Sequence, residues 1–155
     1  MTTRTDREYD DPCVHQVAVF MHNRLGQLRE VLQRLEEVQV TVHAVSIVDA
    51  VDYAVTRLVT DKIDTARRAL KESGFPITET MLLAVEVPDF RAGLLEVTRA
   101  LLAAEINIHY AYPMFTRPRG HGVVVLHIDS LSSAAKVLER QGFGLLDDRD
   151  LEVMG

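Results

Sequence analysis

Two short loops in this chain carry the residues best suited to holding a ligand. Asn23-Arg24-Leu25-Gly26 follows the apolar run Gln16–Met21, and Asp89–Gly93 follows the apolar run Leu83–Val87. A glycine in such a loop lets the backbone approach a bound molecule closely. Each loop also precedes an amphipathic stretch, and the free amide groups of a helix start can hold a carboxylate. The simpler alternative is that the glycines only permit a turn and that Asn23 and Asp89 only cap helices, a role compatible with binding.

The composition limits what else the chain does. It has 155 residues, a formal net charge of −6, 47% hydrophobic residues and 26% charged residues, which is typical of a globular protein. The negative charge argues against nucleic-acid or membrane-surface binding, which needs clustered Lys and Arg. No apolar run approaches the length of a membrane span, and the start lacks a signal core. One cysteine, Cys13, excludes an internal disulfide, and we expect a cytoplasmic location.

The chain contains an internal repeat. Asp61–Phe75 and Asp129–Phe143 share an aspartate, an alanine, a leucine and a final Gly-Phe, all at an offset of 68. Gly26 and Gly93 differ by 67, and the strands that carry His43 and His109 differ by 66. We therefore expect the second copy to lose one residue in its first helix and to gain two in its central hairpin.

Each copy follows the order β-α-β-β-α-β. Hydrophobic periodicity predicts strands and helices by their alternation and by their 3.6-residue spacing. The expected strands are 16–21, 40–47, 53–60, 77–87, 106–112 and 121–128, and the expected helices follow Gly26, Asp61, Gly93 and Asp129, with Gly74 as a left-handed cap. We assign residues 1–14 to a tail, 15–81 and 82–150 to two modules, and 151–155 to a second tail.

This order predicts an α+β fold of two ferredoxin-like modules, each an antiparallel sheet with both helices on one face. The other sheet face is apolar too: Val17–Met21 and Val123–Ile128 are mostly aliphatic at both alternate sets of positions. A sheet that is apolar on both faces must be covered on both. We therefore expect the second face to pack against another copy of the chain, giving a homodimer.

Catalysis and metal binding find little support. Acylphosphatases of this fold pair a loop arginine with a strand asparagine, but Arg24 and Asn107 fall in different copies. No nucleophile with a paired base is apparent. His43 and His109 occupy equivalent positions without further metal ligands nearby in sequence, so structural hydrogen bonding is favoured over a metal site. We expect no enzyme activity, no metal and no cofactor.

The doubled strand-loop-helix pattern resembles that of tandem ACT domain proteins. Asn23, Gly26 and Leu28 match the ACT loop signature in the first copy, and Asp89, Gly93 and Leu95 match it in the second. The resemblance covers about residues 14–150 and is strongest to small stand-alone proteins made only of two ACT modules. Many ACT loops have proline before the glycine, where this chain has Leu25 and Ala92.

The resemblance implies an allosteric regulatory protein that binds a small amino acid between ACT modules, with Asn23 or Asp89 receiving the ammonium group. The alternative is a regulatory subunit of an amino-acid biosynthetic enzyme such as acetohydroxyacid synthase. The two copies differ, because the second has Tyr110 and Tyr112 where the first has Ala44 and Ser46. One copy can therefore bind the ligand while the other only supports the fold. The alternative role of the tyrosines is packing at an interface. The expected ligand-binding residues are Asn23, Arg24, Leu25, Gly26, Gln27, Leu28, Asp89, Arg91, Gly93, Leu94, Tyr110 and Tyr112.

Overall fold

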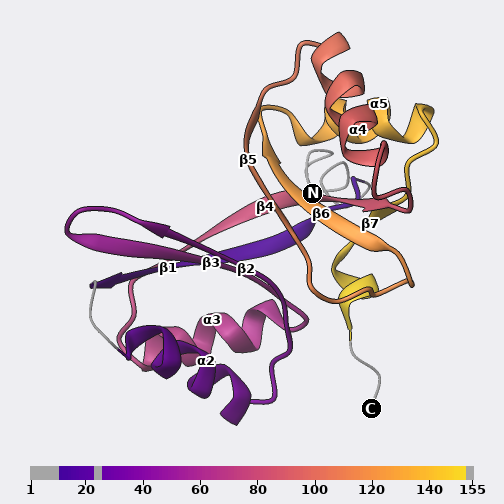
Figure 1. Cartoon of the computed structure of the whole chain (residues 1–155). Coiled ribbons are helices and arrows are strands. Elements are labelled where there is room, and N and C mark those ends of the chain that lie inside the picture. Colours follow the sequence, from indigo (N-terminus) through magenta and orange to yellow (C-terminus); the bar gives the residue numbers. More distant parts are fainter. Residues whose placement is uncertain (1–10, 23–25, 153–155) are drawn as a thin grey trace, which may run out of the picture. The chain divides into compact units, whose positions relative to one another are not determined.

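In the computed structural model, which describes residues 11–22 and 26–152, the chain divides into two units (Figure 1). The N-terminal module comprises His15–Thr80 with residues 151 and 152. The C-terminal module comprises Met81–Asp150 with residues 11–14. The boundary lies between Thr80 and Met81, within a single strand.

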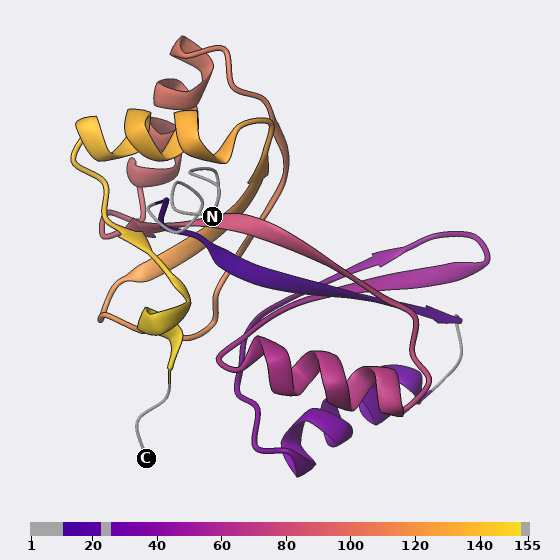
Figure 2. The same cartoon turned by 180° about the vertical axis from the view of Figure 1, so that it is seen from behind.

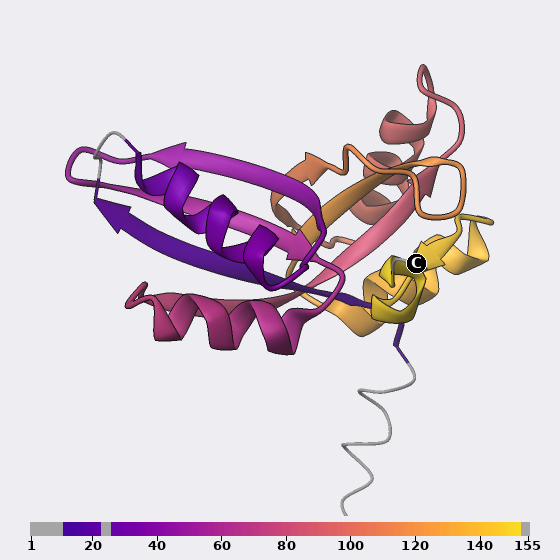
Figure 3. The same ribbon diagram turned by 90° about the horizontal axis from the view of Figure 1, so that it is seen from below.

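The N-terminal module has the predicted order of elements. These are β1 (Val14–His22), α2 (Gln27–Glu37), β2 (Val42–Asp49), β3 (Tyr53–Thr60), α3 (Ile63–Glu72) and β4 (Ile77–Val87). The strand order is β2-β3-β1-β4, and β3 pairs antiparallel with both β1 and β2. Helices α2 and α3 lie together on one face of these strands, which is the near side in Figure 3. This is the split βαβ arrangement.

The C-terminal module repeats the plan, starting with β4. It continues with α4 (Gly93–Ala103), β5 (Ile108–Pro113), β6 (Gly122–Ile128), α5 (Leu131–Arg140), β7 (Leu145–Leu146) and a 3₁₀ turn, η1 (Asp148–Leu151). Its strand order is β5-β6-β4-β7, again antiparallel. Helices α4 and α5 pack against each other (Figure 2). No helix in the described part of the chain is long and apolar enough to cross a membrane.

Each module has its own hydrophobic core, built from matching positions. In the N-terminal module Val31 and Leu35 of α2 pack with strand residues that include Val19. In the C-terminal module Val97 and Leu101 of α4 take the same places, 66 residues later along the chain. Burying one such side chain stabilises a fold by about 1.5–3 kcal/mol. The cores therefore fix how the two copies correspond.

The repeated landmarks have the same local roles in both copies. Asp61 accepts the Thr41 amide at 2.8 Å through its carboxylate and donates its own amide to the Thr41 carbonyl at 3.1 Å. Asp129 makes the matching pair with Asn107 at 3.2 and 3.3 Å. Gly74 follows the end of α3 in the left-handed conformation, with φ 83°, which confirms the predicted cap. Glycine is usual at such a position because it has no Cβ to clash.

The expected deletion in the first helix of the second copy is wrong. Helices α2 and α4 both have eleven residues and begin and end 66 positions apart. The structural counterpart of Gly26 is therefore Ala92, and Gly93 corresponds to Gln27. Gly26 has φ 94° with no atom near a hypothetical Cβ, so it serves the turn itself. Gly93 is not in that conformation and is instead required by the close approach of Val87, whose Cγ1 a Cβ would strike.

The sheet faces that point away from the helices are apolar, as expected. Ala18, Val59, Leu82 and Val125 on these faces are at most 6% exposed, as is Gln16, at 1%. At the outer end of this face in the N-terminal module, Val48 and Tyr53 are 43% and 47% exposed, and further large exposed apolar side chains lie on α4.

Candidate functional site

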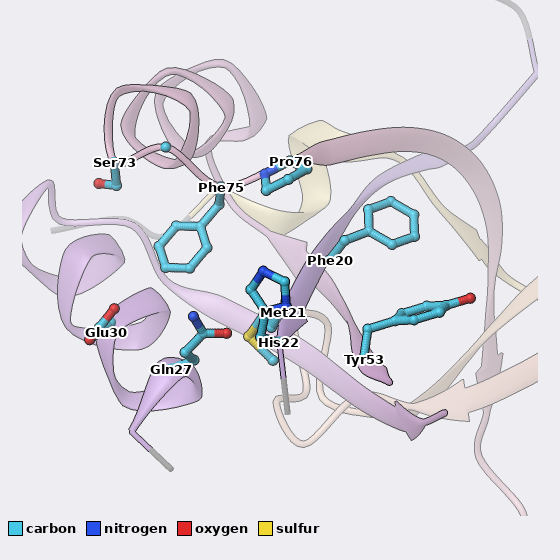
Figure 4. A pocket seen from close by; sticks show the side chains of 10 residues that line it. Phe20, Met21, His22, Gln27, Glu30, Tyr53, Ser73, Phe75 and Pro76 are labelled. Carbon is cyan, nitrogen blue, oxygen red and sulfur yellow. The ribbon is translucent and has the colours of Figure 1, made fainter. Parts of the chain in front are cut away.

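A cavity of about 390 Å³ opens in the N-terminal module beside the first predicted loop. Its volume lies within the range of small-molecule sites, about 300–1,000 Å³. Four segments meet there: the end of β1, the first turn of α2, the start of β3 and the turn after α3 (Figure 4). The lining residues are Phe20, Met21, His22, Gln27, Glu30, Tyr53, Ser73, Gly74, Phe75 and Pro76.

Aromatic rings provide much of the apolar lining. Phe20 of β1 and Tyr53 of β3 are diagonal neighbours, since Phe20 pairs with Val55 and Tyr53 with His22, and their ring centroids lie 6.5 Å apart in a tilted arrangement. Phe75 is partly buried against the core of the module and faces the cavity from the opposite side (Figure 4). Such walls favour an apolar or aromatic group on a bound molecule.

The polar lining includes one group without a partner. The Oε1 atom of Gln27 is buried, and no residue in the described part of the chain donates a hydrogen bond to it. A buried amide that is left unsatisfied costs about 1–3 kcal/mol, and rotation of the amide can present either its oxygen or its NH₂ group. Glu30, in the same first turn of α2, is exposed and adds a carboxylate at the mouth. A ligand that carries a hydrogen-bond donor, above all a cationic one, would meet both groups.

The start of α2 provides the opposite kind of group. Gly26 is the N-cap and makes no side-chain capping hydrogen bond. The first amides of a helix have no partner within the helix, and the helix dipole favours an anion beside them. The left-handed backbone of Gly26 leaves open space on its Cα. This end of α2 is therefore suited to a carboxylate.

The predicted residues of the first loop divide into three groups. Asn23, Arg24 and Leu25 lie outside the described residues. Gly26 forms the N-cap of α2, and Gln27 lines the cavity. Leu28 packs against the hydrophobic core of the module instead.

The second loop is built differently. The carboxylate of Asp89 accepts the amides of Arg91 at 2.9 Å and Ala92 at 3.3 Å, so it holds the turn that begins α4. Gly93 is buried, whereas Arg91 and Leu94 are exposed. The predicted residues of this loop therefore do not converge on one point.

An ion pair occupies the position that matches the cavity wall. Glu86 is the counterpart of Phe20 in the second copy, 66 residues later, and is only 6% exposed. Arg119 donates a hydrogen bond to its Oε1 at 2.5 Å and contacts Asp150 at 3.5 Å, and these acceptors raise the pKa of Arg119, the Glu86 hydrogen bond most of all. The Glu86 carboxylate lies against Gly144, which leaves no room for a Cβ there. The second copy thus has charge and close packing where the first has an aromatic wall.

Tyr110 and Tyr112 share one face of β5, as predicted. Their rings stack with centroids 6.3 Å apart, and Tyr110 also lies 4.8 Å from the ring of His127. The ring of His109 also lies 5.0 Å from that of His127, and its Nε2 is 2.6 Å from the Asp129 carboxylate. Partial desolvation opposes the charge on Asp129, but hydrogen bonds from Asn107 and His109 outweigh it and lower its pKa. The tyrosines belong to the C-terminal module and do not line the N-terminal cavity.

The two equivalent histidines have separate structural partners. His43 is 4% exposed, and its Nε2 lies 2.7 Å from the carbonyl oxygen of Leu151. Hydrogen bonding is therefore the role the structure gives both His43 and His109. Among the described residues, no group of three or more His, Cys, Asp or Glu is placed to hold a metal ion.

Sequence reasoning missed most of the cavity. Glu30, Tyr53 and Phe75 were not among the expected residues, nor were the other residues that β1 and the turn after α3 contribute. The predicted βαββαβ order contained the signal, because it places the end of the first strand, the start of the third and the end of the second helix at one edge of the module.

The family model for the ACT domain pair matches residues 12–154, almost the whole chain. The chain belongs to the ACT domain pair family. This confirms the resemblance and the α+β fold of two ferredoxin-like modules. A search of curated proteins gave no match.

Solved structures with a similar fold include three of interest for this ACT domain pair. Protein BT0572 from Bacteroides thetaiotaomicron is 25% identical, with a TM-score of 0.84 over 93% of this chain and 99% of that one. The regulatory subunit of aspartate kinase from Thermus thermophilus, in its ligand-free form, is 14% identical, with a TM-score of 0.60 over 84% and 93%. A structure of aspartokinase alpha and beta subunits is 16% identical, with a TM-score of 0.53 over 83% and 95%. The last two likenesses concern the fold alone.

Proposed function

We propose that this ACT domain pair is a non-catalytic regulatory protein that binds a small amino acid in the N-terminal cavity. The observation that carries the proposal is the cavity itself, placed beside the start of α2, where the N-cap Gly26 has no side chain to cap the helix, and next to the buried Gln27 Oε1 that no described residue satisfies. In this proposal the protein is cytoplasmic and acts as a homodimer whose state depends on the ligand.

The zwitterion of an amino acid matches the polarity of the cavity. Its carboxylate is placed at the first amides of α2, after Gly26, where the helix dipole stabilises it by about 0.3–1 kcal/mol. Its ammonium group is placed toward the Glu30 carboxylate and the Gln27 oxygen. We keep Asn23, Arg24 and Leu25 among the proposed ligand-binding residues because they directly precede Gly26 in the sequence.

The side chain of the ligand is placed among the rings of Phe20, Tyr53 and Phe75. This assignment favours a bulky apolar or aromatic amino acid over glycine, aspartate or lysine. The second copy supports the fold in this proposal, because Glu86 and Arg119 replace the aromatic wall there. Arg91, Gly93 and Leu94 then serve the C-terminal module and not the ligand.

A thermal-shift screen against the twenty amino acids, followed by calorimetric titration, tests the proposal. A ligand at 100 times its Kd stabilises the folded state by about 2.7 kcal/mol. For a chain of this length that corresponds to a rise in Tm of about 5–10 °C. No hit in the set would reject an amino acid as the ligand.

A matched pair of variants locates the site. Glu30 in α2 and Glu96 in α4 are first-turn glutamates at equivalent positions. We expect Glu30→Gln to weaken binding about tenfold or more, equivalent to at least ~1.4 kcal/mol, because it removes the charge that faces the ammonium. Glu96→Gln should leave binding unchanged. Equal effects of the two variants would place the site elsewhere.

A second candidate is a regulatory subunit of an amino-acid biosynthetic enzyme such as acetohydroxyacid synthase. It is favoured by Phe90 and Phe115, which are 69% and 65% exposed, and by Arg117, whose guanidinium lies 5.3 Å from the centre of the Phe90 ring. Exposed aromatic and arginine side chains are common binding hot spots. Co-elution of the purified chain with the enzyme, lost in a Phe90→Ser variant, would support this function; failure to co-elute would reject it for that enzyme.

A further inference from the structure

Phe90 is an exposed aromatic residue whose ring is packed between two parts of the C-terminal module. It lies in the loop between β4 and α4 and is 69% exposed. The edge of its ring rests on Gly122, the first residue of β6, where a Cβ would come within 2.9 Å of the ring. The guanidinium of Arg117, in the turn between β5 and β6, lies 5.3 Å from the ring centre. The ring is therefore held in place while most of its surface faces solvent.

Both segments that carry these side chains are anchored to the module. In the turn between β5 and β6, Arg119 forms the ion pair with Glu86, and the Gly120 amide donates to the Arg117 carbonyl at 3.1 Å. In the loop before α4, the Asp89 carboxylate accepts two backbone amides. The surface is thus ordered before a partner arrives, which lowers the entropic cost of binding.

The fold does not require this surface. The hairpin between β2 and β3 in the first copy is closed by residues 50–52, which include no arginine and no phenylalanine. The matching hairpin between β5 and β6 is closed by residues 114–121, and this longer turn carries Arg117 and Phe115, which is 65% exposed. Loops that a scaffold does not need for its own packing are frequent places for binding residues.

Two cations beside Phe90 have no carboxylate partner among the described residues. Arg91 follows Phe90 in the loop and Arg117 lies at its ring, and both are exposed. Arg119 and Arg149 of the same module, in contrast, each form an ion pair. A guanidinium at the face of an aromatic ring keeps its N–H groups available, and these can bind a carboxylate at two points.

We propose that Phe90, Arg91, Phe115 and Arg117, which we call the Phe90 surface, bind an acidic peptide segment of a partner protein. Carboxylates of the segment meet the two arginines, and an apolar side chain between them packs against the phenylalanines. Aromatic and arginine side chains are the commonest centres of such binding. The proposal deepens the second candidate function and rests on it for the existence of a protein partner.

The charge of the chain favours a short peptide over a larger polyanion. The net charge is −6, so a nucleic acid or an anionic membrane is repelled beyond the immediate surroundings of the arginines. A short acidic segment meets only the Phe90 surface, where the charges are complementary. Such complementarity selects the partner and orients it.

Fluorescence polarisation with a labelled peptide and the full chain tests the proposal. The probe is Glu-Phe-Glu-Leu-Glu, and Gln-Phe-Gln-Leu-Gln is the neutral control. We expect the acidic peptide to bind at least about tenfold more tightly, and Arg117→Gln or Phe90→Ser to weaken its binding about tenfold or more. Arg99→Gln, which removes an exposed charge from α4, should change the Kd by less than about twofold.

Two further variants test the stacked geometry. Arg117→Lys keeps the charge but loses the planar group, and should weaken binding about fivefold. Gly122→Ala moves the Phe90 ring without changing any residue of the Phe90 surface, and should weaken binding about threefold, by loss of preorganisation. Unchanged melting curves would show that the variants fold like the natural chain.

The outcomes separate this proposal from the second candidate function. No binding of the acidic peptide, equal binding of both peptides, or equal effects of Arg117→Gln and Arg99→Gln would overturn the proposal. Binding of single-stranded oligouridylate or phosphatidylserine vesicles through the same residues, in place of the peptide, would overturn it too. Peptide binding that depends on Phe90 and Arg117, without co-elution with acetohydroxyacid synthase, would reject that enzyme and support the proposal.

Discussion

Replacing Gly93 by alanine should destabilise the protein, although alanine is the better helix former. Gly93 is the first residue of α4 and is buried. Helix propensity alone favours alanine by about 0.5–1 kcal/mol. Against this, the new Cβ would collide with Cγ1 of Val87, a core residue that is 8% exposed. Overpacking costs about 1–3 kcal/mol, so we expect a net loss of about 1–2 kcal/mol in the free energy of unfolding.

Urea denaturation of a double-mutant cycle measures the collision directly. Val87→Ala removes the atom that the new Cβ would strike, and alone it should cost about 1–3 kcal/mol through lost burial and a small cavity. In the double variant the nearest remaining atom to the new Cβ is the Cβ of residue 87, at 3.6 Å, which is an ordinary contact. The loss should therefore be smaller than the sum of the singles by about 1 kcal/mol or more. Additive losses, or a Gly93→Ala variant more stable than the natural protein, would refute the packing argument.

Gly26 provides the contrasting control. Its φ of 94° strains any residue with a Cβ, yet no atom lies within 4 Å of the position that a Cβ would occupy. Gly26→Ala should cost about 1–2 kcal/mol through backbone strain alone. Asparagine, which tolerates left-handed backbone, should recover part of that loss, whereas no substitution of a neighbour should.

Three further expectations concern charged and titratable groups. Arg119→Met should lower the free energy of unfolding, measured by urea titration, by about 1–3 kcal/mol, because it leaves Glu86 without its ion-pair partner. The loss should be smaller than for a fully buried pair because Arg119 is 45% exposed. Adding Glu86→Leu to Arg119→Met should restore most of the lost stability. Burial first, and then Asp148, Asp11 and Asp147, raise the pKa of Cys13 to about 11, so alkylation by iodoacetamide should stay slow at pH 8 and accelerate up to about pH 11. Hydrogen bonding to Arg67 lowers the pKa of Glu79, so the ion pair stabilises the fold fully at pH values above the usual glutamate pKa. This contribution is under about 1 kcal/mol and is lost as the pH falls through the lowered pKa. Glu79→Gln should flatten that part of the acid unfolding curve, and an unchanged curve would count against the assignment.

The fold could be predicted because its signals are local and repeated. The extents of β3 and β4 match the expected ranges, and the glycine of each Gly-Phe landmark, Gly74 and Gly142, is left-handed and follows the end of a helix. The error at Gly93 arose from matching residue types instead of core positions. Val31 with Val97, and Leu35 with Leu101, give the correct offset, whereas a glycine can be selected for a turn at one position and for close packing at another.

The candidate site was predictable only in part, because a cavity forms where the side chains of several segments leave space unfilled in the folded module. Gln27 could be named from its place in the loop. Tyr53 and Phe75 come from segments far along the chain, and neither carries a local signal of binding. Nothing in sequence spacing showed that Glu86 and Arg119 would occupy the matching place in the second copy, since the residues are 33 apart and meet only in the folded module.

The differences between the copies fall on positions that folding does not constrain. Both copies keep the same core spacing, the same aspartate bridge to the second strand and the same glycine cap, so these features report the fold. Phe20 in the first copy lines the cavity, whereas Glu86 at the matching position in the second copy forms an ion pair. In our proposal the first copy therefore binds the ligand and the second supports the fold. Thermodynamic linkage makes the coupling reciprocal: if the ligand changes the dimer Kd by some factor, dimerisation changes the ligand Kd by the same factor. If the ligand Kd and the dimer Kd prove independent of each other, ligand binding does not regulate dimerisation.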